Sequence, residues 1–457
     1  MKRSMLKLFL ATPLLVHFSC GTGSSPSEGD EAWNAANNPV IMGFNKLKDA
    51  YQYTNTFSAL PLKAQLDITP WASDYWPNNK GGTSYRWQAG QAAIQKLKES
   101  NSDASASEQR KAAEPFYAYA ELGKPAAGMT EALLSPIEKF DMLRGDANFS
   151  LTASERKRSD VMKTVAGDPA YVADFKIPSW YGLCHAWAPA SYQFKPVADV
   201  QVSGPGGKPI YFSAGDVQAL LTMFLDRVKS TEETQFLGGR CEESFKELMQ
   251  KVKDKTLTPE AYFEAVSASA CRDTNAGSFH LVLANQIGRL REPFVVDVTR
   301  DQEVWNQPIV AYESRVVGEE APNANAAAGT EKMLKIKTAM YYVKSVKPTI
   351  TGKPSYAYDL ALYTYFVELN SKGAIIGGQW IDKVNPTLNS SLASSQSKDR
   401  PDFMWKRPLP AFSGNFAALK SLYESASLVY EKRKYKSFDP VKDMPASKKE
   451  KLEAFWR

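Results

Sequence analysis

The sequence has 457 residues and a formal net charge of +6, and three of the positive side chains lie within residues 1–19. The remaining chain carries +3 with basic and acidic residues well mixed, which excludes the basic stripe that nucleic-acid binding needs. The length favours two or three domains, and a hydrophobic content of 43% is enough for packed cores. We expect a globular protein with no nucleic-acid partner, and a monomer.

Residues 1–19 are typical of a secretory signal peptide, with a basic start and a short apolar run, MLKLFLATPLLVHF. The run ends before Cys20, which resembles the lipidated cysteine of bacterial lipoproteins, although His17 stands where such signals carry an apolar residue. Plain cleavage is the alternative. Residues 20–44 are small and polar and predict a flexible tether. No later segment is apolar enough to span a bilayer. We expect an exported protein, lipid-anchored at the outer membrane or periplasmic face, or otherwise secreted.

Residues 45–175 predict a mostly helical N-terminal region. GGTSYRWQAGQAAIQKLKES and AEPFYAYAEL have apolar residues at three-to-four spacing, and DITPWASDYWPNN is an aromatic loop. The polar segment KESNSDASASEQRK (98–111) is a protease-sensitive loop by composition. The region before residue 176 is therefore also a candidate pro-segment over a cleft.

Residues 176–317 predict a mixed core. A helix can start at Cys184, and SAGDVQALLTMFLDRVK forms another with Ser213 as its N-cap. CEESFKELMQKVKDK and TPEAYFEAVSASA predict two more helices. GSFHLVLANQIGRLREPFVVDVT (277–299) is rich in β-branched and aromatic residues and predicts a β-hairpin.

The polar segment 318–332 predicts a domain boundary, after which residues 333–440 are strand-rich. KIKTAMYYVKSV, YDLALYTYFVELN and AIIGGQWID predict strands, with NSKG as the turn between the last two. The tail, 441–457, is a short helix or has no fixed structure.

The number of cysteines, four, indicates which thiols are paired and which is free. If Cys20 is lipidated, an odd number remains, which leaves one free thiol in an oxidising compartment. The simplest partition joins Cys241 to Cys271 and leaves Cys184 free. A bridge between Cys184 and Cys241 is the rival.

A cysteine nucleophile needs a neighbouring base or cation. Outside the signal peptide the chain has two histidines, and His185 points away from its neighbour Cys184 on a helix or a strand. His280 is then the base by elimination. A hairpin turn at IGRL places His280 opposite Asp297, within reach for the orienting role of a triad. A longer turn would place Asp301 there instead.

The start of a helix at Cys184 would lower the thiol pKa and supply one oxyanion donor from its backbone N–H. The indole of Trp180, or the remote Trp76, is a candidate second donor. We do not expect a zinc site, because Cys184 and His185 lack ligand spacing and further ligands are too few. We expect no metal and no cofactor.

At these residues the chain resembles the oomycete elicitor-type transglutaminases and their bacterial relatives. The matching segments appear in one order over residues 45–410: PWASDYWP, SPIEKFD, WYGLCHAWAPAS, SFHLVLANQIG, VVDVTRDQEVWNQPI, IIGGQW and RPDFMWKRP. The resemblance implies an α+β protein with a papain/transglutaminase-like catalytic core, a helical N-terminal region and a strand-rich C-terminal region.

The resemblance also implies a protein-glutamine γ-glutamyltransferase-like enzyme, with Cys184 as nucleophile, His280 as base and Asp297 as acid. Asn306 is a possible further polar contact, and His185 has a structural or supporting part. The partners would be proteins with accessible Gln and Lys side chains, which it cross-links or deamidates. The alternatives are a papain-like cysteine peptidase and a catalytically inactive surface-binding lipoprotein.

Overall fold

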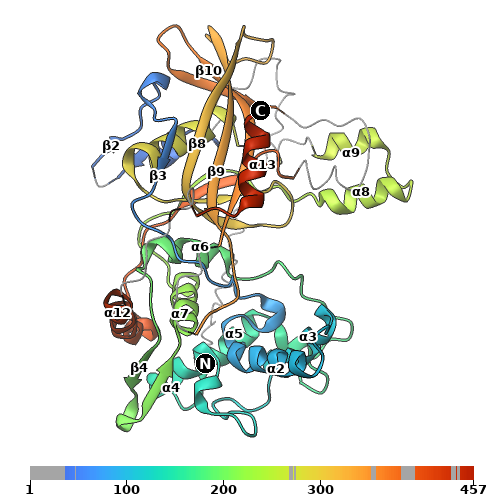
Figure 1. Cartoon of the computed structure of the whole chain (residues 1–457), viewed down its shortest axis with the longest axis vertical. Helices are drawn as coiled ribbons and strands as arrows, with labels where there is room; N and C mark the ends of the chain where they lie inside the picture. The colour runs from blue at the N-terminus through green and yellow to red at the C-terminus, as the bar shows by residue number, and fades with distance from the viewer. Residues whose placement is uncertain are drawn as a thin grey trace, which may run out of the picture.

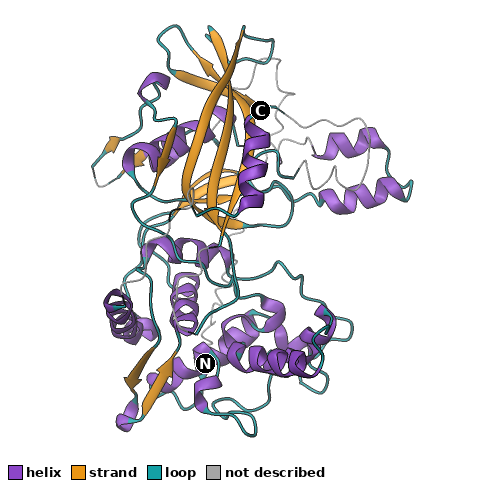
Figure 2. Ribbon diagram, in the orientation of Figure 1, coloured by secondary structure: helices purple, strands orange, loops and turns teal. Residues whose placement is uncertain are grey.

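The computed structural model describes residues 36–46, 48–266, 271, 274–350, 357–381, 397–433, 439 and 443–457. The predicted signal peptide and Cys20 lie outside these residues. Figures 1 and 2 show a strand-rich upper part above a mostly helical lower part, and helix α6 (Cys184–Gln193) lies at their junction. This mixture of helices with an antiparallel sheet confirms the predicted α+β class.

The upper part is built on one sheet of eight described strands, in the order β11-β10-β9-β8-β7-β12-β6, with β3 paired to β8. The strand pairs of this sheet are antiparallel, and β8, β9 and β10 form its long centre (Figure 1). The strands run over Lys63–Gln65 (β3), Gln235–Gly238 (β6), Val295–Asp297 (β7), Asn306–Glu320 (β8), Lys332–Val343 (β9), Tyr358–Leu369 (β10), Ile375–Trp380 (β11) and Phe403–Lys406 (β12). Two short pairs lie apart from it: β1 (Phe44–Asn45) with β2 (Ala50–Tyr51), and β4 (Val200–Ser203) with β5 (Pro209–Phe212).

The lower part packs its helices around α7 (Ala214–Arg227), which begins where the sequence predicts. The Ser213 hydroxyl accepts from the Asp216 backbone N–H, and the Asp216 carboxylate accepts from the Ser213 N–H, a capping box that satisfies two free donors of the first turn. The other helices of this part are α2 (Trp87–Ser100), α3 (Ala106–Ala113), α4 (Pro136–Leu143), α5 (Ser150–Arg158) and α12 (Ala417–Lys432).

The helical N-terminal region and the core around α6 share one hydrophobic interior. Trp71, Trp87, Trp187 and Phe224 are buried in the same cluster, which also reaches Tyr341 in β9. AEPFYAYAEL forms only a short 3-10 turn over Glu114–Phe116 instead of the expected helix.

The predicted hairpin at 277–299 is wrong. The structure has helix α10 (Ala276–Leu283), then a π-helical segment (Ala284–Leu290), then strand β7. The Asn275 side chain accepts from the backbone N–H groups of Gly277 and Ser278 and so caps α10. Every residue of α10 is buried against the sheet, so its apolar run lacks the polar face by which an amphipathic helix is recognised.

The expected domain boundary at 318–332 is also wrong. Strands β8 and β9 pair from Ile309 with Tyr342 out to Glu320 with Met333, so the segment between them is the loop of one long hairpin. The predicted strands at 335–346, 358–370 and 374–382 correspond to β9, β10 and β11. The tail forms helix α13 (Ala446–Trp456), which packs beside β9 and β10 (Figure 1).

A small satellite core projects from the sheet. Helices α8 (Phe245–Lys253) and α9 (Pro259–Val266) lie side by side at one edge of Figures 1 and 2. A disulfide joins Cys241 to Cys271 within this core, which is the pairing that the cysteine count favours. Among the described residues Cys184 is the free cysteine, so the rival bridge to Cys241 does not form.

Candidate active site

Cys184 is the first residue of helix α6, as the sequence predicts. The chain enters this helix through a close approach to the aromatic loop 67–79: the Leu183 N–H donates to the Tyr75 carbonyl at 2.6 Å. A Cβ atom added at Gly182 would lie 2.6 Å from that same oxygen. Glycine is therefore required at position 182, because no larger residue lets the two backbones approach so closely.

The Cys184 thiol is almost buried, with 8% of the residue exposed, and its polar contacts come from the start of strand β8. The side-chain amide Nδ2 of Asn306 donates to Sγ at 3.5 Å, and the thiol donates to the Val304 carbonyl at 3.6 Å. Asn306 is itself oriented, since its Oδ1 accepts from Trp405 Nε1 at 2.7 Å. The structure thus brings the predicted polar residue Asn306 directly to the thiol.

Opposing effects act on the pKa of the Cys184 thiol. Burial raises it, and the negative charge of Asp297 raises it further. The side-chain amide and backbone N–H of Asn306 and the backbone N–H of His185 lower it, because they donate to the sulfur. The net pKa lies above the ordinary value, so the resting group is a thiol that already faces donors able to stabilise a thiolate.

Asp297 lies on the same face of the sheet as Asn306, because these two residues are directly opposed in the β7–β8 pair. Its Oδ1 accepts from the backbone N–H groups of Trp305 at 3.0 Å and Thr299 at 3.3 Å. Its Oδ2 is buried and has no hydrogen-bond partner. Burial first, and then the nearby charge of Asp402, raise the pKa of Asp297 well above its ordinary value.

His280 is not at this site, which corrects the predicted triad. It lies on α10, 1% exposed, stacked on Phe57 with its Nδ1 2.8 Å from the Tyr365 hydroxyl. Its Nε2 is buried without a partner, and no hydrogen bond in the described structure joins it to Cys184 or Asp297. Burial lowers the pKa of His280 to about 4. The predicted pairing depended on a hairpin register, and the helix removes that register.

The remaining candidates are distributed around the thiol without completing a triad. His185 is half-exposed on α6, and its Nε2 lies 2.9 Å from Asp226 Oδ1, consistent with a supporting part. Trp180 packs edge-on against Tyr181 and is partly exposed. Trp76 is fully buried beside the loop before α6, and its indole N–H has no partner.

Asp301, the alternative orienting residue, also lies apart from His280. Its Oδ1 accepts from the Glu303 backbone N–H at 2.9 Å, and it lines a neighbouring cavity. Sequence reasoning missed Trp405, which orients Asn306, and Tyr75, whose carbonyl fixes the entry to α6. Both lie within the quoted family segments, which is the one signal that pointed to them.

Within the described ranges, no group of three or more His, Cys, Asp or Glu side chains is arranged to hold a metal ion. None of the helices in the same ranges combines the length and apolar character that a membrane span needs.

Comparisons with known proteins bear on this arrangement. The family described as transglutaminase elicitor matches residues 154–411, which is more than half of the chain. Among solved structures, the GP42 transglutaminase from Phytophthora sojae has a similar fold, with a TM-score of 0.55 and 20% identity over 86% of this chain and 99% of that one. A search of curated proteins finds no match. The resemblance predicted from the motifs is confirmed, and this chain belongs to the transglutaminase elicitor family.

Proposed function

We propose that this transglutaminase-like protein is a cysteine acyltransferase that acts on glutamine side chains of proteins, with Cys184 as nucleophile. The observation that carries the proposal is the environment of one thiol. Cys184 is free and begins a helix, and its sulfur accepts a hydrogen bond from the side-chain amide of an oriented Asn306. A helix N-terminus and N–H donors favour the anionic form of sulfur, which is the reactive form.

In the proposed reaction, the Cys184 thiol loses its proton to the Asp297 carboxylate, whose Oδ2 is unpartnered. The thiolate attacks the γ-carboxamide carbon of a glutamine, and the carbon–nitrogen bond then breaks. The amine leaves as ammonia with the thiol proton, and a thioester remains. A lysine amine displaces the sulfur to give an isopeptide bond, or water displaces it to give glutamate. Either step returns the thiol.

This assignment changes the roles predicted from the sequence. Asp297 carries the proton itself instead of orienting a histidine, and its raised pKa suits a proton acceptor for a thiol. His280 has a structural part in α10. Asn306 holds the sulfur and Trp405 positions Asn306.

The test uses protein that begins after Cys20, assayed for ammonia release and for incorporation of a fluorescent amine into casein. The Cys184→Ala variant should lose both activities, because no other described thiol is free. Turnover retained in Cys184→Ala would refute the site. The Cys241→Ser/Cys271→Ser double variant is the matched control, and its folded fraction should still label casein.

The same assay separates the two rival functions. Casein fragments without incorporated amine would identify a peptidase. Ligand binding that is equal in wild type and Cys184→Ala, with no turnover by either, would identify an inactive surface-binding protein.

The location and partners also form part of the proposal. Residues 1–19 direct export, a lipid on Cys20 anchors the protein to the cell envelope, and the substrates are proteins with accessible Gln and Lys side chains. Mass spectrometry of the purified N-terminal peptide should show a diacylglyceryl group on Cys20. A Cys20→Ser variant found in the same membrane fraction would contradict the anchor.

A further inference from the structure

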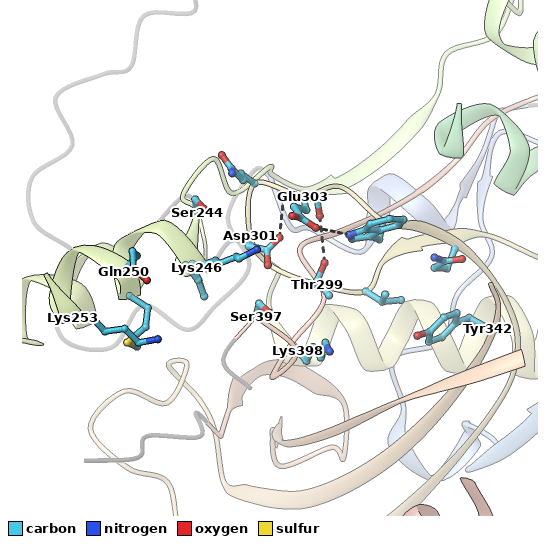
Figure 3. A pocket seen from close by; sticks show the side chains of 16 residues that line it. Ser244, Lys246, Gln250, Lys253, Thr299, Asp301, Glu303, Tyr342, Ser397 and Lys398 are labelled. Carbon is cyan, nitrogen blue, oxygen red and sulfur yellow. Dashed lines mark hydrogen bonds between the residues drawn. The ribbon is translucent and has the colours of Figure 1, made fainter. Parts of the chain in front are cut away.

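Figure 3 shows a cavity of the protein, which has a volume of about 650 Å³. Its walls come from helix α8, from the segment 298–305 between β7 and β8, from Gln307 in β8, and from Ser397 and Lys398. Phe245, Met249 and Trp305 give it apolar surface. It is an open cavity of the size that holds a small ligand or a few residues of a peptide.

The cavity and the thiol share one stretch of backbone. The Val304 carbonyl and the Asn306 side chain contact Cys184. The side chains of Trp305 and Gln307, on either side of Asn306, line the cavity instead, since side chains of an extended chain alternate between faces. Trp305 stands at the border, with its ring 5.7 Å edge-on from Tyr75.

Tyr75 lies between the thiol and the cavity, since it interacts with Cys184 and with the cavity residue Glu303. Burial first, and then nearby negative charge at Asp74, Cys184 and Glu303, raise the pKa of Tyr75 to about 12. Glu303 is a cavity residue, and its carboxylate accepts from Trp305 Nε1 at 3.2 Å (Figure 3). The residues that line the cavity and the residue whose amide donates to the thiol are therefore adjacent in the chain.

One lining residue has a polar group that lacks a partner. Gln307 is 6% exposed, and its amide oxygen is buried without accepting a hydrogen bond. An unsatisfied buried acceptor costs free energy and is rare in native proteins. A backbone or amide N–H of a bound peptide would satisfy it, whereas the apolar side chains beside it would not.

The charges around the cavity indicate which peptide it takes. Lys246, Lys253 and Lys398 line it, and none of the three has a carboxylate within ion-pair distance in the described part of the chain. Two carboxylates, Asp301 and Glu303, also line the cavity, and the charge of Lys398 lowers the pKa of Asp301. Three lysines against two carboxylates leave a net positive charge on the lining, so complementarity favours an acidic ligand.

We propose that this cavity is the subsite for an acidic peptide segment of the acyl-donor protein, next to its reactive glutamine. The segment's backbone N–H donates to Gln307 Oε1, its acidic side chains face Lys246 and Lys398, and its glutamine passes Trp305 toward Cys184. The inference rests on the proposed acyl-transfer function and adds the class of sequence that the enzyme selects.

The test measures binding without catalysis. Fluorescein-labelled short peptides, each with a single Gln flanked by Glu, Ala or Lys, are titrated with the Cys184→Ala protein and followed by fluorescence anisotropy. The Glu-flanked peptide should bind most tightly. Reversing two lining charges (Lys246→Glu/Lys398→Glu) should weaken its binding about tenfold. The control Lys96→Glu/Lys98→Glu, on the exposed face of α2, makes the same change of net charge and should alter binding by less than about twofold.

The outcomes separate the subsite from the chemistry. Equal binding of the three peptides, tighter binding of the Lys-flanked one, equal weakening by both double variants, or no binding at all would overturn the subsite. Gln307→Met should weaken all three peptides alike, and unchanged binding would remove Gln307 from the proposal. Charge-selective binding by a wild type that transfers no amine would leave the subsite standing and refute the acyl transfer. Amine transfer with an unchanged kcat/KM in Lys246→Glu/Lys398→Glu would leave the acyl transfer standing and refute the subsite.

Discussion

Replacing His280 tests the largest departure of the structure from the predicted triad. Burial lowers the pKa of His280 from 6.5 to about 4. Because this folded-state pKa lies below the unfolded one, the unfolded chain binds protons more tightly, and stability present above the unfolded pKa is lost as the pH falls toward the folded one. Between about pH 7.5 and about pH 5, this single group should cost about 2 kcal/mol of unfolding free energy.

The assay is urea unfolding of wild type and His280→Gln at those two pH values. The variant cannot titrate in this range, so its stability should fall by about 2 kcal/mol less than that of wild type between the two pH values. Tyr365→Phe is the control: it removes the hydrogen bond to Nδ1 but leaves the imidazole buried, so it should keep the acid sensitivity. Equal acid sensitivity of wild type and His280→Gln would refute the reasoning.

The same variant addresses chemistry. Amine incorporation at neutral pH should survive in His280→Gln, since the side chain makes no contact with Cys184 in the described structure. A loss of about 100-fold in kcat with native stability would instead identify His280 as the general base.

Three further outcomes follow from described contacts. Asn306→Ala removes the amide that donates to the thiol, so it should slow iodoacetamide alkylation at fixed pH and lower kcat about 100-fold; an unchanged alkylation rate would contradict its role. Loss of the disulfide in Cys241→Ser/Cys271→Ser, which closes a loop with a separation of 30 residues, should lower the unfolding free energy by about 3 kcal/mol in a denaturant titration. Glu138→Ala leaves the buried Arg86 without its partner at 2.6 Å and should cost about 4 kcal/mol, measured as a lower urea midpoint. A cost below about 1 kcal/mol would show that water reaches that pair.

The sequence predicted those elements whose pattern is local. Helix α7 carries its own capping box at Ser213, and β10 and β11 are joined by a turn with Gly373 at a positive φ. Helix α10 could not be distinguished from a strand, because a helix buried on all sides and a buried strand both appear as a continuous apolar run. Because α10 was predicted as a strand, His280 was placed opposite Asp297.

In the candidate site, too, some residues could be predicted from local sequence and others could not. Cys184 at a helix start follows from the residues beside it, and Asn306 came from the family motif. The bond from Trp405 to Asn306 joins residues 99 positions apart, and the free oxygen of Asp297 depends on a strand pair that a hairpin register had assigned otherwise. Contacts of this kind depend on tertiary packing and leave no local pattern.

The close approach of Gly182 to the aromatic loop determines how proteolysis of the N-terminal region would affect the thiol site. The predicted loop 98–111 is mostly the end of α2 and the start of α3, and the aromatic loop before α2 supplies the carbonyl against which the chain enters α6. Trp71 and Trp87 are buried in the same interior as α6, so a cut between α2 and α3 would leave both in place. We therefore predict that the helical region is a permanent wall of the thiol site and not a removable cap, and that a chain beginning after Trp71 would lose the proposed activity.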